Sequence, residues 1–394
     1  MTLRYPLACL AAISLAGPTS ADIGTLQGTS RQETLPAARS VASYARSWGL
    51  AAEQLAWANG LSTEGKTGPK VTLPARILPA NPPKNGAVVN LAERGMYLFR
   101  EGKYRGFFPL AIGREDKAAF HTPTGTFTIV DRQKNPTWVA PKSNWAKALK
   151  KEKIAGNDDN NPLGEYWFGF DHPKGGYGFH ENLAPETTGD KVSHGCMRLY
   201  PEHAKKIFND KLLVGGDTVR IENRPVVLGK DKSGEIYASV FPATYEAKAD
   251  LAANLTKALK KEGLLGLLPP DRLKQMAGNR TGVPRSVLGK SVGLMIDGQP
   301  SEGKTPALRR DGSVLVPVSL ARELDCQVAY DAKTGLIKIS KDGKSKTFTL
   351  DSKATGPRAF RWGDQTMVAA RSLLDGLDIP FIYNGKERQL EIDG

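Results

Sequence analysis

The last part of the chain contains an internal repeat, which constrains the fold more than any other feature of the sequence. "SVLVPVSLARELDCQVAYDAKTGLIKI" aligns with "QTMVAARSLLDGLDIPFIYNGKERQLEI", and Leu320 meets Leu373 at an offset of 53 residues (373 − 320 = 53). Each copy predicts a short helix followed by a strand hairpin. Cys326 stands where the second copy has Ile379, which predicts a small buried residue rather than half of a disulfide. We therefore expect residues 290–394 to form an α+β repeat domain of their own.

The rest of the chain leaves room for further domains, because 394 residues suffice for two or three. The composition, with 40% hydrophobic and 24% charged residues, is typical of globular proteins. The formal net charge of +14 indicates an anionic partner such as nucleic acid, a membrane surface or an acidic cell-wall polymer. The basic residues are scattered, and no zinc-finger or RNA-binding motif accompanies them, so we expect no nucleic-acid partner.

Residues 1–21 have the features of a secretory signal peptide. One early positive charge precedes the apolar stretch "PLACLAAISLAG", and small residues follow up to Asp22. The stretch is well short of the ~20 residues that a membrane-spanning helix needs. Cys9 precedes most of the apolar core, so it does not fit a lipid-attachment cysteine. We expect an exported protein, in the periplasm or the cell wall, whose mature form has no integral membrane segment.

Residues 35–80 are expected to form a small α+β unit. "SVASYARSWGLAAEQLAWANGL" has the apolar spacing of two short helices punctuated by Gly49 and Gly60, and "KVTLPARIL" predicts a strand. The order resembles a LysM domain, a carbohydrate-binding module of cell-wall proteins. The turn "LPAARS" departs from the usual polar turn of that module, which leaves a structural cap on the next domain as the alternative role.

Residues 86–222 are expected to form a β-rich domain, with a hairpin around "EGKY" and a long irregular excursion between about 131 and 165. Long loops on a strand scaffold usually form or cover a site. Residues 223–285 add a strand pair and a helix in which Leu251, Leu255 and Leu259 recur every four residues, which predicts a packed face. The chain is therefore predicted to be a mainly β, multidomain protein.

The candidate chemistry is concentrated in one window. All five histidines lie within residues 121–203 together with Cys196, and they are His121, His172, His180, His194 and His203. A metal site needs three or four converging ligands, but the window holds one cysteine and no HxxxH or CxxC pair. An inert buried cysteine is a second interpretation, although the polar, glycine-containing "SHGC" is poor core sequence. A nucleophilic cysteine is the third, and it requires an imidazole or a helix N-terminus to activate the thiol.

Several motifs in this window resemble those of L,D-transpeptidases of the YkuD/ErfK type. "HTPTGTFTI", "NPTWVAP", "NPLGEYWFGF", "YGFHENLAP" and "VSHGCMRLYPEHA" follow one another in the order found in that family. The resemblance covers roughly residues 35–265 and implies that Cys196 is the nucleophile and His180 the general base and acid. It implies an acyl-enzyme formed with the tetrapeptide stem of peptidoglycan, release of D-Ala and transfer to an amine. No metal or cofactor is implied.

The resemblance also implies roles for the neighbouring residues. The backbone N–H groups of His194, Gly195 and Cys196 would stabilise the oxyanion, while Ser193 and His194 would shape the loop and orient His180. Arg198 would meet a carboxylate of the stem, or alternatively form a structural salt bridge. Asn161 and Trp138 would belong to the substrate groove or to the supporting structure, and not to catalysis.

One position departs from the family pattern, where relatives commonly have "HG" after the catalytic histidine and this chain has "HE". Glu181 would raise the pKa of the imidazole, narrow the acceptor side, or point to solvent without effect. The sequence therefore leaves the identity of the acyl acceptor open. With water as the acceptor, the protein would be an L,D-carboxypeptidase. A non-enzymatic wall-binding scaffold is a further alternative.

The repeat at residues 290–394 resembles the N-terminal-like domain of copper amine oxidases. That resemblance implies a binding or adaptor role and a protein partner. It does not imply copper, because the unit contains no histidine.

Overall fold

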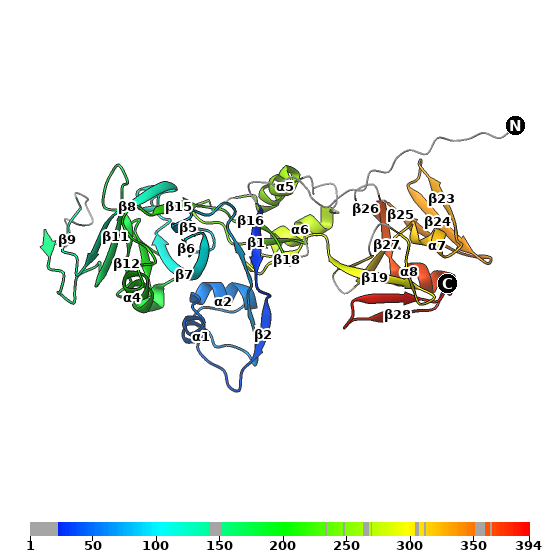
Figure 1. Cartoon of the computed structure of the whole chain (residues 1–394), viewed down its shortest axis with the longest axis horizontal. Coiled ribbons are helices and arrows are strands. Elements are labelled where there is room, and N and C mark those ends of the chain that lie inside the picture. Colours follow the sequence, from blue (N-terminus) through cyan, green and yellow to red (C-terminus); the bar gives the residue numbers. More distant parts are fainter. Residues whose placement is uncertain are drawn as a thin grey trace.

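The computed structural model describes residues 23–141, 146, 152–232, 235–246, 249–262, 268, 270–303, 307–310, 313–350, 359–362 and 365–394. The expected signal peptide, residues 1–21, lies outside these ranges. The molecule is elongated, with the β-rich domain at one end, the repeat unit at the other and a smaller sheet between them (Figure 1). Strands predominate over helices, which confirms the mainly β prediction.

The small N-terminal unit has the order strand, helix, helix, strand. Strand β2 (Arg31–Thr34) pairs antiparallel with β3 (Lys70–Leu73), and α1 (Val41–Ser47) and α2 (Ala52–Asn59) lie between them in sequence. The Ser40 side chain accepts the N–H of Ser43 to start α1, and Gly60 ends α2 with a left-handed φ of 63°. The unit thus starts at β2, before the expected residue 35, because "RQET" carries no apolar alternation that would reveal a strand.

The middle sheet crosses the expected domain boundaries. Its order is β18-β17-β16-β1-β4, and its members are β1 (Ile23–Gln27), β4 (Arg76–Leu78), β16 (Val226–Lys230), β17 (Ile236–Val240) and β18 (Arg285–Ser286). The expected single strand "KVTLPARIL" is divided at Pro74, whose missing N–H interrupts a ladder. Its second half, β4, leaves the N-terminal unit and joins the strands of the extension.

Two helices cover this middle sheet. Helix α5 (Leu251–Lys261) starts at Asp250, whose carboxylate accepts the N–H groups of Ala252 and Ala253. Its Leu251, Leu255 and Leu259 are buried against residues of β16 and β17, as their spacing predicted. Helix α6 (Pro270–Gly278) contacts α5.

The β-rich domain is built on a nine-stranded sheet of order β13-β7-β14-β12-β11-β8-β15-β5-β6, in which β6 also pairs with β7. This last pairing closes the sheet on itself. The strands are β5 (Gly86–Asn90), β6 (Gly95–Arg100), β7 (Lys103–Gly113), β8 (Gly125–Lys134), β11 (Tyr166–Phe170), β12 (Gly178–Glu181), β13 (Lys191–Ser193), β14 (Met197–Leu199) and β15 (Thr218–Glu222). The β6–β7 turn falls at "EGKY", where the hairpin was expected.

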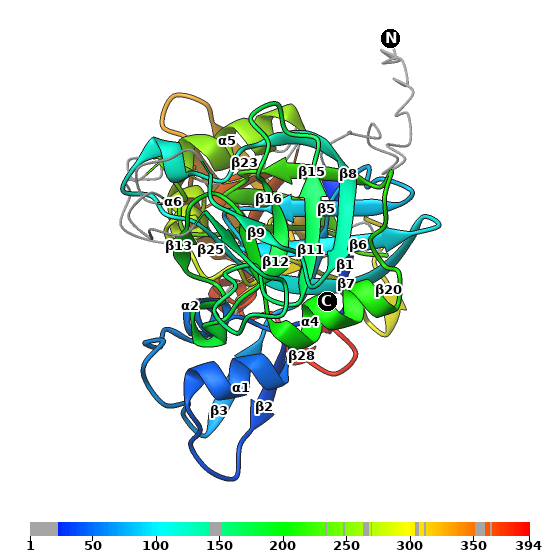
Figure 2. The ribbon, with the colours of Figure 1, turned by 90° about the vertical axis from the view of Figure 1, so that its left-hand side faces the viewer.

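Short elements complete this domain. Helix α4 (Pro201–Asn209) begins with a proline that has no N–H to satisfy, and it lies beside β11 and β12 (Figure 2). The 3₁₀ turns η1 (Ala118–Phe120) and η2 (Pro185–Thr187) shape two loops. Within the excursion, β9 (Trp138–Val139) pairs with β10 (Lys153–Ile154).

The C-terminal unit has the repeated pattern that the sequence predicts. The first copy runs through β22 (Ser313–Pro317), α7 (Leu320–Glu323), β23 (Gln327–Asp331) and β24 (Leu336–Lys341). The second runs through β27 (Gln365–Ala369), α8 (Ala370–Leu374), η4 (Asp375–Leu377), β28 (Phe381–Asn384) and β29 (Gln389–Ile392). The equivalent Asp325 and Asp378 both have left-handed φ values, 56° and 52°. The two copies are therefore alike in backbone conformation at this position as well as in sequence.

The two hairpins of the repeat unit have different partners. The second, β28–β29, joins the sheet of β19 (Lys290–Ile296), β20 (Gln299–Pro300), β21 (Ala307–Arg310), β22, β26 (Ala359–Trp362) and β27. The first pairs with β25 (Lys344–Thr349) in a separate three-stranded sheet. Cys326 and Ile379 are both buried in the same apolar cluster, and Cys326 is a free thiol.

Candidate active site

Two parallel strands bring the candidate base and nucleophile together. In the β12–β14 pair, Phe179 is opposite Met197 and His180 is opposite Arg198. Phe179 and Met197 face the core, where both are buried. Because side chains alternate along a strand, His180 and Arg198 share the opposite face. Cys196 immediately precedes β14, and if the alternation of the strand is continued by one residue its side chain falls on the same face as His180.

The local hydrogen bonds define which nitrogen of His180 faces the reaction. Its side chain is buried, and Nδ1 lies 2.8 Å from the carbonyl oxygen of Glu181. A carbonyl only accepts, so Nδ1 carries the proton and Nε2 keeps a free lone pair. Burial, reinforced by the charge of Arg198 and opposed by the Glu181 hydrogen bond, lowers the pKa of His180 to about 3. The imidazole is therefore a neutral base at physiological pH.

The Cys196 thiol lies at the end of a tight loop. Gly195 has a φ of 118°, and a Cβ there would lie 2.6 Å from the Tyr177 ring, so glycine is required on both counts. The thiol donates to the carbonyl of Gly176 at 3.3 Å. Burial raises the pKa of Cys196 to about 11, although the Gly178 N–H and the Arg198 charge both favour the thiolate. The resting site thus holds a neutral thiol near a neutral imidazole.

The Ser193 hydroxyl ties this loop together and changes the expected set of oxyanion donors. Its Oγ donates to the carbonyl of Cys196 at 2.5 Å and accepts the N–H of Gly195 at 3.1 Å. The loop-shaping role expected of Ser193 agrees with these contacts. The Gly195 N–H is engaged within the loop, which argues against its expected role as an oxyanion donor. Of that set, the N–H groups of His194 and Cys196 remain.

His194 packs beside η1, and its expected role in orienting His180 stays a prediction. Its ring packs edge-to-face on Phe120 with a centroid separation of 4.6 Å, and burial lowers its pKa. The nitrogen of His180 that needs orienting is held by the Glu181 carbonyl. The contact of His194 with Phe120 therefore supports its expected role in shaping the loop, at η1.

Arg198 is a cation that pairs with no carboxylate in the described part of the chain. Its side chain shares a face with His180, and its guanidinium charge lowers the pKa values of both His180 and Cys196. Among the residues that the structure describes, no carboxylate forms an ion pair with Arg198, and its buried Nε has no hydrogen-bond partner. Of the two expected roles, this environment favours a carboxylate from outside the chain over a structural salt bridge.

Asn161 and Trp138 support the structure of the excursion. Asn161 is 1% exposed, donates to the carbonyls of Pro136 and Ala155, and accepts the N–H of Leu163. Its polar capacity is therefore used within the chain, and the expected contact with substrate is not favoured. Trp138 is buried in the β9–β10 pair. Of the two expected alternatives, both residues fit the structural one.

The Glu181 carboxylate departs from two of its three expected roles, while a narrower acceptor side stays a prediction. It is buried rather than turned to solvent, and it accepts the backbone N–H of Glu165. Burial raises the pKa of Glu181, while the pKa of the adjacent His180 is lowered rather than raised. The residue influences the base through its backbone carbonyl, because the alternation of the strand directs its side chain elsewhere.

The other histidines pack as aromatic rings, and two tyrosines join the site's surroundings. His121 stacks on Tyr245 with centroids 3.9 Å apart, while His172 and His203 contact aromatic rings of the same domain. Tyr177 covers Gly195, and its place in the "YGFHENL" motif is a signal that could have identified it. Tyr245 comes from the segment after β17 and donates to the carbonyl of Gly113 at 2.8 Å. No local pattern marks that tyrosine.

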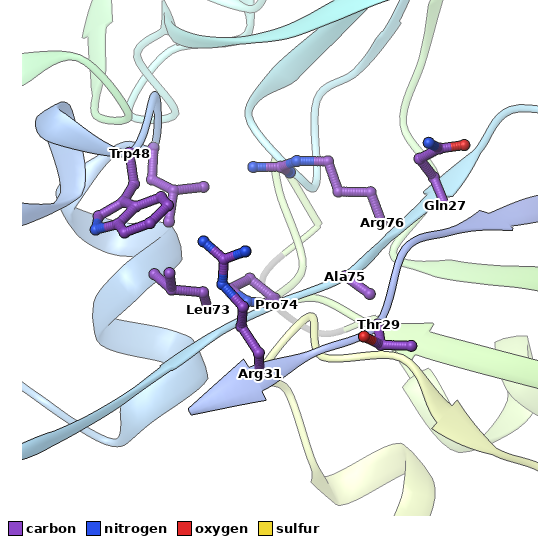
Figure 3. Close-up of a pocket in the computed structure, with 9 residues that line it drawn as sticks. Gln27, Thr29, Arg31, Trp48, Leu73, Pro74, Ala75 and Arg76 are labelled. Carbon is purple, nitrogen blue, oxygen red and sulfur yellow. The ribbon is translucent and has the colours of Figure 1, made fainter. Parts of the chain in front are cut away.

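A separate groove of about 250 Å³ lies where β1, β2, α1 and β4 meet (Figure 3). Trp48, Arg31 and Arg76 surround it, and none of its lining residues belongs to the Cys196 site. The Arg31 guanidinium lies 4.7 Å from the Trp48 ring centroid, and Arg76 pairs with Glu93 at 3.1 Å. The cationic groups of this groove therefore already have partners within the chain.

Two other kinds of feature are absent from the described ranges. No group of three or more His, Cys, Asp or Glu side chains there is placed to hold a metal ion. None of the helices in the same ranges combines the length and the apolar character needed to cross a bilayer.

Comparison with known proteins identifies the domain that carries Cys196 and His180. Residues 84–221 match the YkuD family, the L,D-transpeptidase catalytic domain. This match confirms the resemblance drawn from the sequence motifs for that domain. The resemblances of the N-terminal and C-terminal units to LysM and copper amine oxidase domains stay predictions.

The relatives of this YkuD domain come from different bacteria. YcfS of Escherichia coli K12, a probable L,D-transpeptidase, is 30% identical over 43% of this chain and 53% of its own. YbiS of the same strain, also a probable L,D-transpeptidase, is 26% identical over 70% of this chain and 93% of its own. The chain thus spans about half the length of YcfS and nearly all of YbiS. An L,D-transpeptidase structure from Stackebrandtia nassauensis is 24% identical over 37% of this chain and 58% of its own, with a TM-score of 0.27.

Proposed function

We propose that the protein is an exported L,D-transpeptidase that acts on the tetrapeptide stems of peptidoglycan through Cys196 and His180. The observation that carries the proposal is the parallel β12–β14 register, which places a neutral imidazole, a thiol and an unpaired guanidinium on one face. The YkuD match of residues 84–221 supports the reaction class. The formal charge of +14 suits an anionic wall, in the periplasm or the cell wall.

The acylation step follows from the protonation states of the two residues. The thiol sulfur of Cys196 attacks the carbonyl carbon between the L-centre of diaminopimelate and the terminal D-Ala, and its proton passes to Nε2 of His180. As the C–N bond breaks, the imidazolium returns that proton to the leaving D-Ala amine. A thioester remains. The proton transfer accompanies attack, because burial disfavours a resting thiolate–imidazolium pair.

The second half-reaction resolves the thioester. An acceptor amine attacks the thioester carbonyl and gives its proton to His180, and the thiolate leaves and recovers a proton from the imidazolium. A diaminopimelate side chain as acceptor makes a crosslink, whereas a D-amino acid or a protein lysine makes a modified stem. Arg198 holds a stem carboxylate during both steps, since its charge has no ion-pair partner among the described residues.

In this proposal, the N-terminal and C-terminal units serve binding or support rather than catalysis. The N-terminal unit packs against the YkuD domain and serves as a wall-binding module or a cap, and the repeat unit serves as an adaptor for a protein partner. The register that places His180 and Arg198 on one face lies within β12 and β14 of the YkuD domain. The chemistry is therefore assigned to the YkuD domain alone.

The proposal is tested by incubating the purified protein with disaccharide-tetrapeptide and following the products by mass spectrometry. Dimers that have lost one D-Ala support transfer. Monomers that have lost D-Ala identify a carboxypeptidase, and unchanged substrate identifies a scaffold, so either result contradicts the proposal. A Cys196→Ala variant that folds normally and still turns over substrate at the wild-type rate would also contradict it.

A further inference from the structure

The loop that joins the two halves of the catalytic site rests on the N-terminal unit. Residues 182–190 run from β12, which carries His180, to β13, which ends at Ser193. Arg94, in the β5–β6 turn, donates to the carbonyl of Gly189 at 2.6 Å. Gln54 of α2 donates to the carbonyl of Glu93, next to Arg94, at 2.7 Å. Helix α2 and this turn therefore support the loop together.

The loop and α2 are in direct contact at Gly189. Its φ is 108°, and a Cβ added there would lie 2.2 Å from a carboxylate oxygen of Glu53 and 2.5 Å from the Cβ of Ala51. No side chain fits between the helix and the loop. A movement of α2 away from the domain would therefore release the loop from its support.

Two carboxyl groups meet at this contact. Glu53 of α2 and Asp190 of the loop are joined by a side-chain hydrogen bond. A hydrogen bond between two carboxyl groups requires a proton on one of them, because two carboxylates have only acceptors. Arg94 lies 3.8 Å from Glu53, so the pair with one proton carries one negative charge beside one positive charge.

We propose that Glu53 keeps a proton and donates it to Asp190, and that this hydrogen bond holds the 182–190 loop against α2, so that the N-terminal unit positions His180 and Cys196. Glu53 and Asp190 are positioning residues, since neither touches the reacting atoms. The claim that they position a catalytic site rests on the proposed function. The hydrogen bond between Glu53 and Asp190 does not depend on that function. The N-terminal unit thus has a second role besides binding the wall.

The proton on Glu53 gives the contact a defined pH dependence. Burial and then Asp190 raise the pKa of Glu53 from 4.5 to about 8, against the opposing charge of Arg94. The other ionisable group facing the pair is Tyr200, while Glu115 and Tyr245 face Arg94. A carboxyl with a raised pKa takes up a proton when the contact forms. The contact therefore weakens as pH rises between about 4.5 and about 8 and stays weak above that range.

Hydrogen exchange of the full chain tests this hydrogen bond without any substrate. The N–H groups of Thr187, Thr188 and Asp190 make hydrogen bonds within the loop and report its order. After correction for intrinsic exchange, we expect their exchange to accelerate by ~10-fold or more as pH rises from 6 to 9, because loss of the proton removes the contact that keeps the loop closed. In Glu53→Gln, the amide donates to Asp190 permanently, so the corrected exchange should stay constant over that range.

Glu202→Gln is the matched control, because it breaks the exposed Arg46–Glu202 pair that also links the N-terminal unit to the YkuD domain. It should keep the wild-type pH dependence. Equal pH dependence in wild type and Glu53→Gln, or none in wild type, would overturn the protonated Glu53.

Turnover of tetrapeptide tests the positioning. The ratio of kcat in Glu53→Gln to kcat in wild type should rise above pH 7, with KM changed less than kcat. If this kcat ratio stayed constant with pH while hydrogen exchange showed the expected pH dependence, the positioning role would be wrong and the contact would be only structural. Absence of turnover in every protein would instead refute the proposed function, while the exchange result would still decide whether Glu53 donates to Asp190.

Discussion

The two cysteines of the described chain occupy sites with different neighbours. Burial raises the pKa of both thiols. Cys326 lies in the apolar cluster of the repeat unit and donates to the carbonyl of Leu324. Cys196 lies at a glycine turn beside a neutral imidazole and a cation. The proposed reactivity of Cys196 therefore requires a proton acceptor, because its thiol does not ionise readily by itself.

Covalent labelling tests the contrast between the two thiols most directly. A carbapenem should acylate Cys196 and leave Cys326 unmodified, because only Cys196 has a base to accept its proton. Cys196→Ala should lose at least ~10⁴-fold in turnover, whereas Cys326→Ala should keep wild-type turnover. Peptide mass spectrometry of the labelled protein identifies the site. Label on Cys326 alone would reverse the assignment.

Removing the proposed base, His180, should reduce turnover less than removing Cys196. His180→Gln should lower kcat for tetrapeptide by ~10²–10⁴-fold, the usual contribution of general acid–base catalysis. Because the pKa of His180 is about 3, the acid limb of the wild-type rate should lie well below the pH of 6.5 at which an ordinary histidine titrates. A rate profile measured from pH 3 to 8 checks this, and an acid limb near 6.5 would contradict the buried neutral base.

The same histidine should make stability depend on pH. Its pKa is lowered in the folded state, so the unfolded chain binds the extra proton and stability is lost as pH falls from 6.5 towards about 3. Wild type should lose up to ~5 kcal/mol more than His180→Gln over this range, at ~1.4 kcal/mol per pH unit. Denaturant unfolding at several pH values measures the difference. Parallel losses in the two proteins would contradict the lowered pKa.

Removing the charge of Arg198 should weaken substrate binding more than it slows the chemical step. Arg198→Gln should raise KM for a stem with free carboxylates by ~10-fold or more, the loss expected of a charge-assisted hydrogen bond worth about 1.5–3 kcal/mol. It should also raise the pKa of His180, whose imidazolium Arg198 disfavours. Steady-state kinetics with amidated stems is the control, since their KM should not respond to the variant.

The smallest effect is expected at the loop hydroxyl. Ser193→Ala removes one hydrogen bond to the Cys196 carbonyl and one from the Gly195 N–H. A loss of ~1–3 kcal/mol in stability is expected for such a buried polar contact. Thermal unfolding with parallel turnover checks it. A large gain in kcat would indicate that the freed Gly195 N–H serves as an oxyanion donor after all.

The parts that sequence predicts well are those encoded within short stretches. The "SHGC" box indicates Cys196, and the leucines of α5 indicate a packed face, because both depend on local spacing. The Glu181 contact could not be predicted because the partner N–H belongs to Glu165 on another segment. The hydrogen bond that engages the Gly195 N–H was equally hidden, because a motif does not show where the Ser193 hydroxyl points.

The limits of individual units are hard to predict for a related reason. The first strand of the N-terminal unit and the division at Pro74 both depend on strand partners that lie elsewhere in the chain. Tyr245, which supports the loop beside His121, has no signal in its own neighbourhood. Long-range pairing is therefore the information that a single sequence lacks.

The parallel pairing of β1 with β16 has a consequence for how the molecule is assembled. Ile23 pairs with Leu228, so about two hundred residues separate the two partners in the chain. During synthesis, β1 has an exposed edge until β16 emerges, and exposed edges invite pairing with other chains. Closing so long a loop is also slow. The middle sheet is thus expected to be the last part to fold and the part most exposed to pairing with other chains before folding is complete.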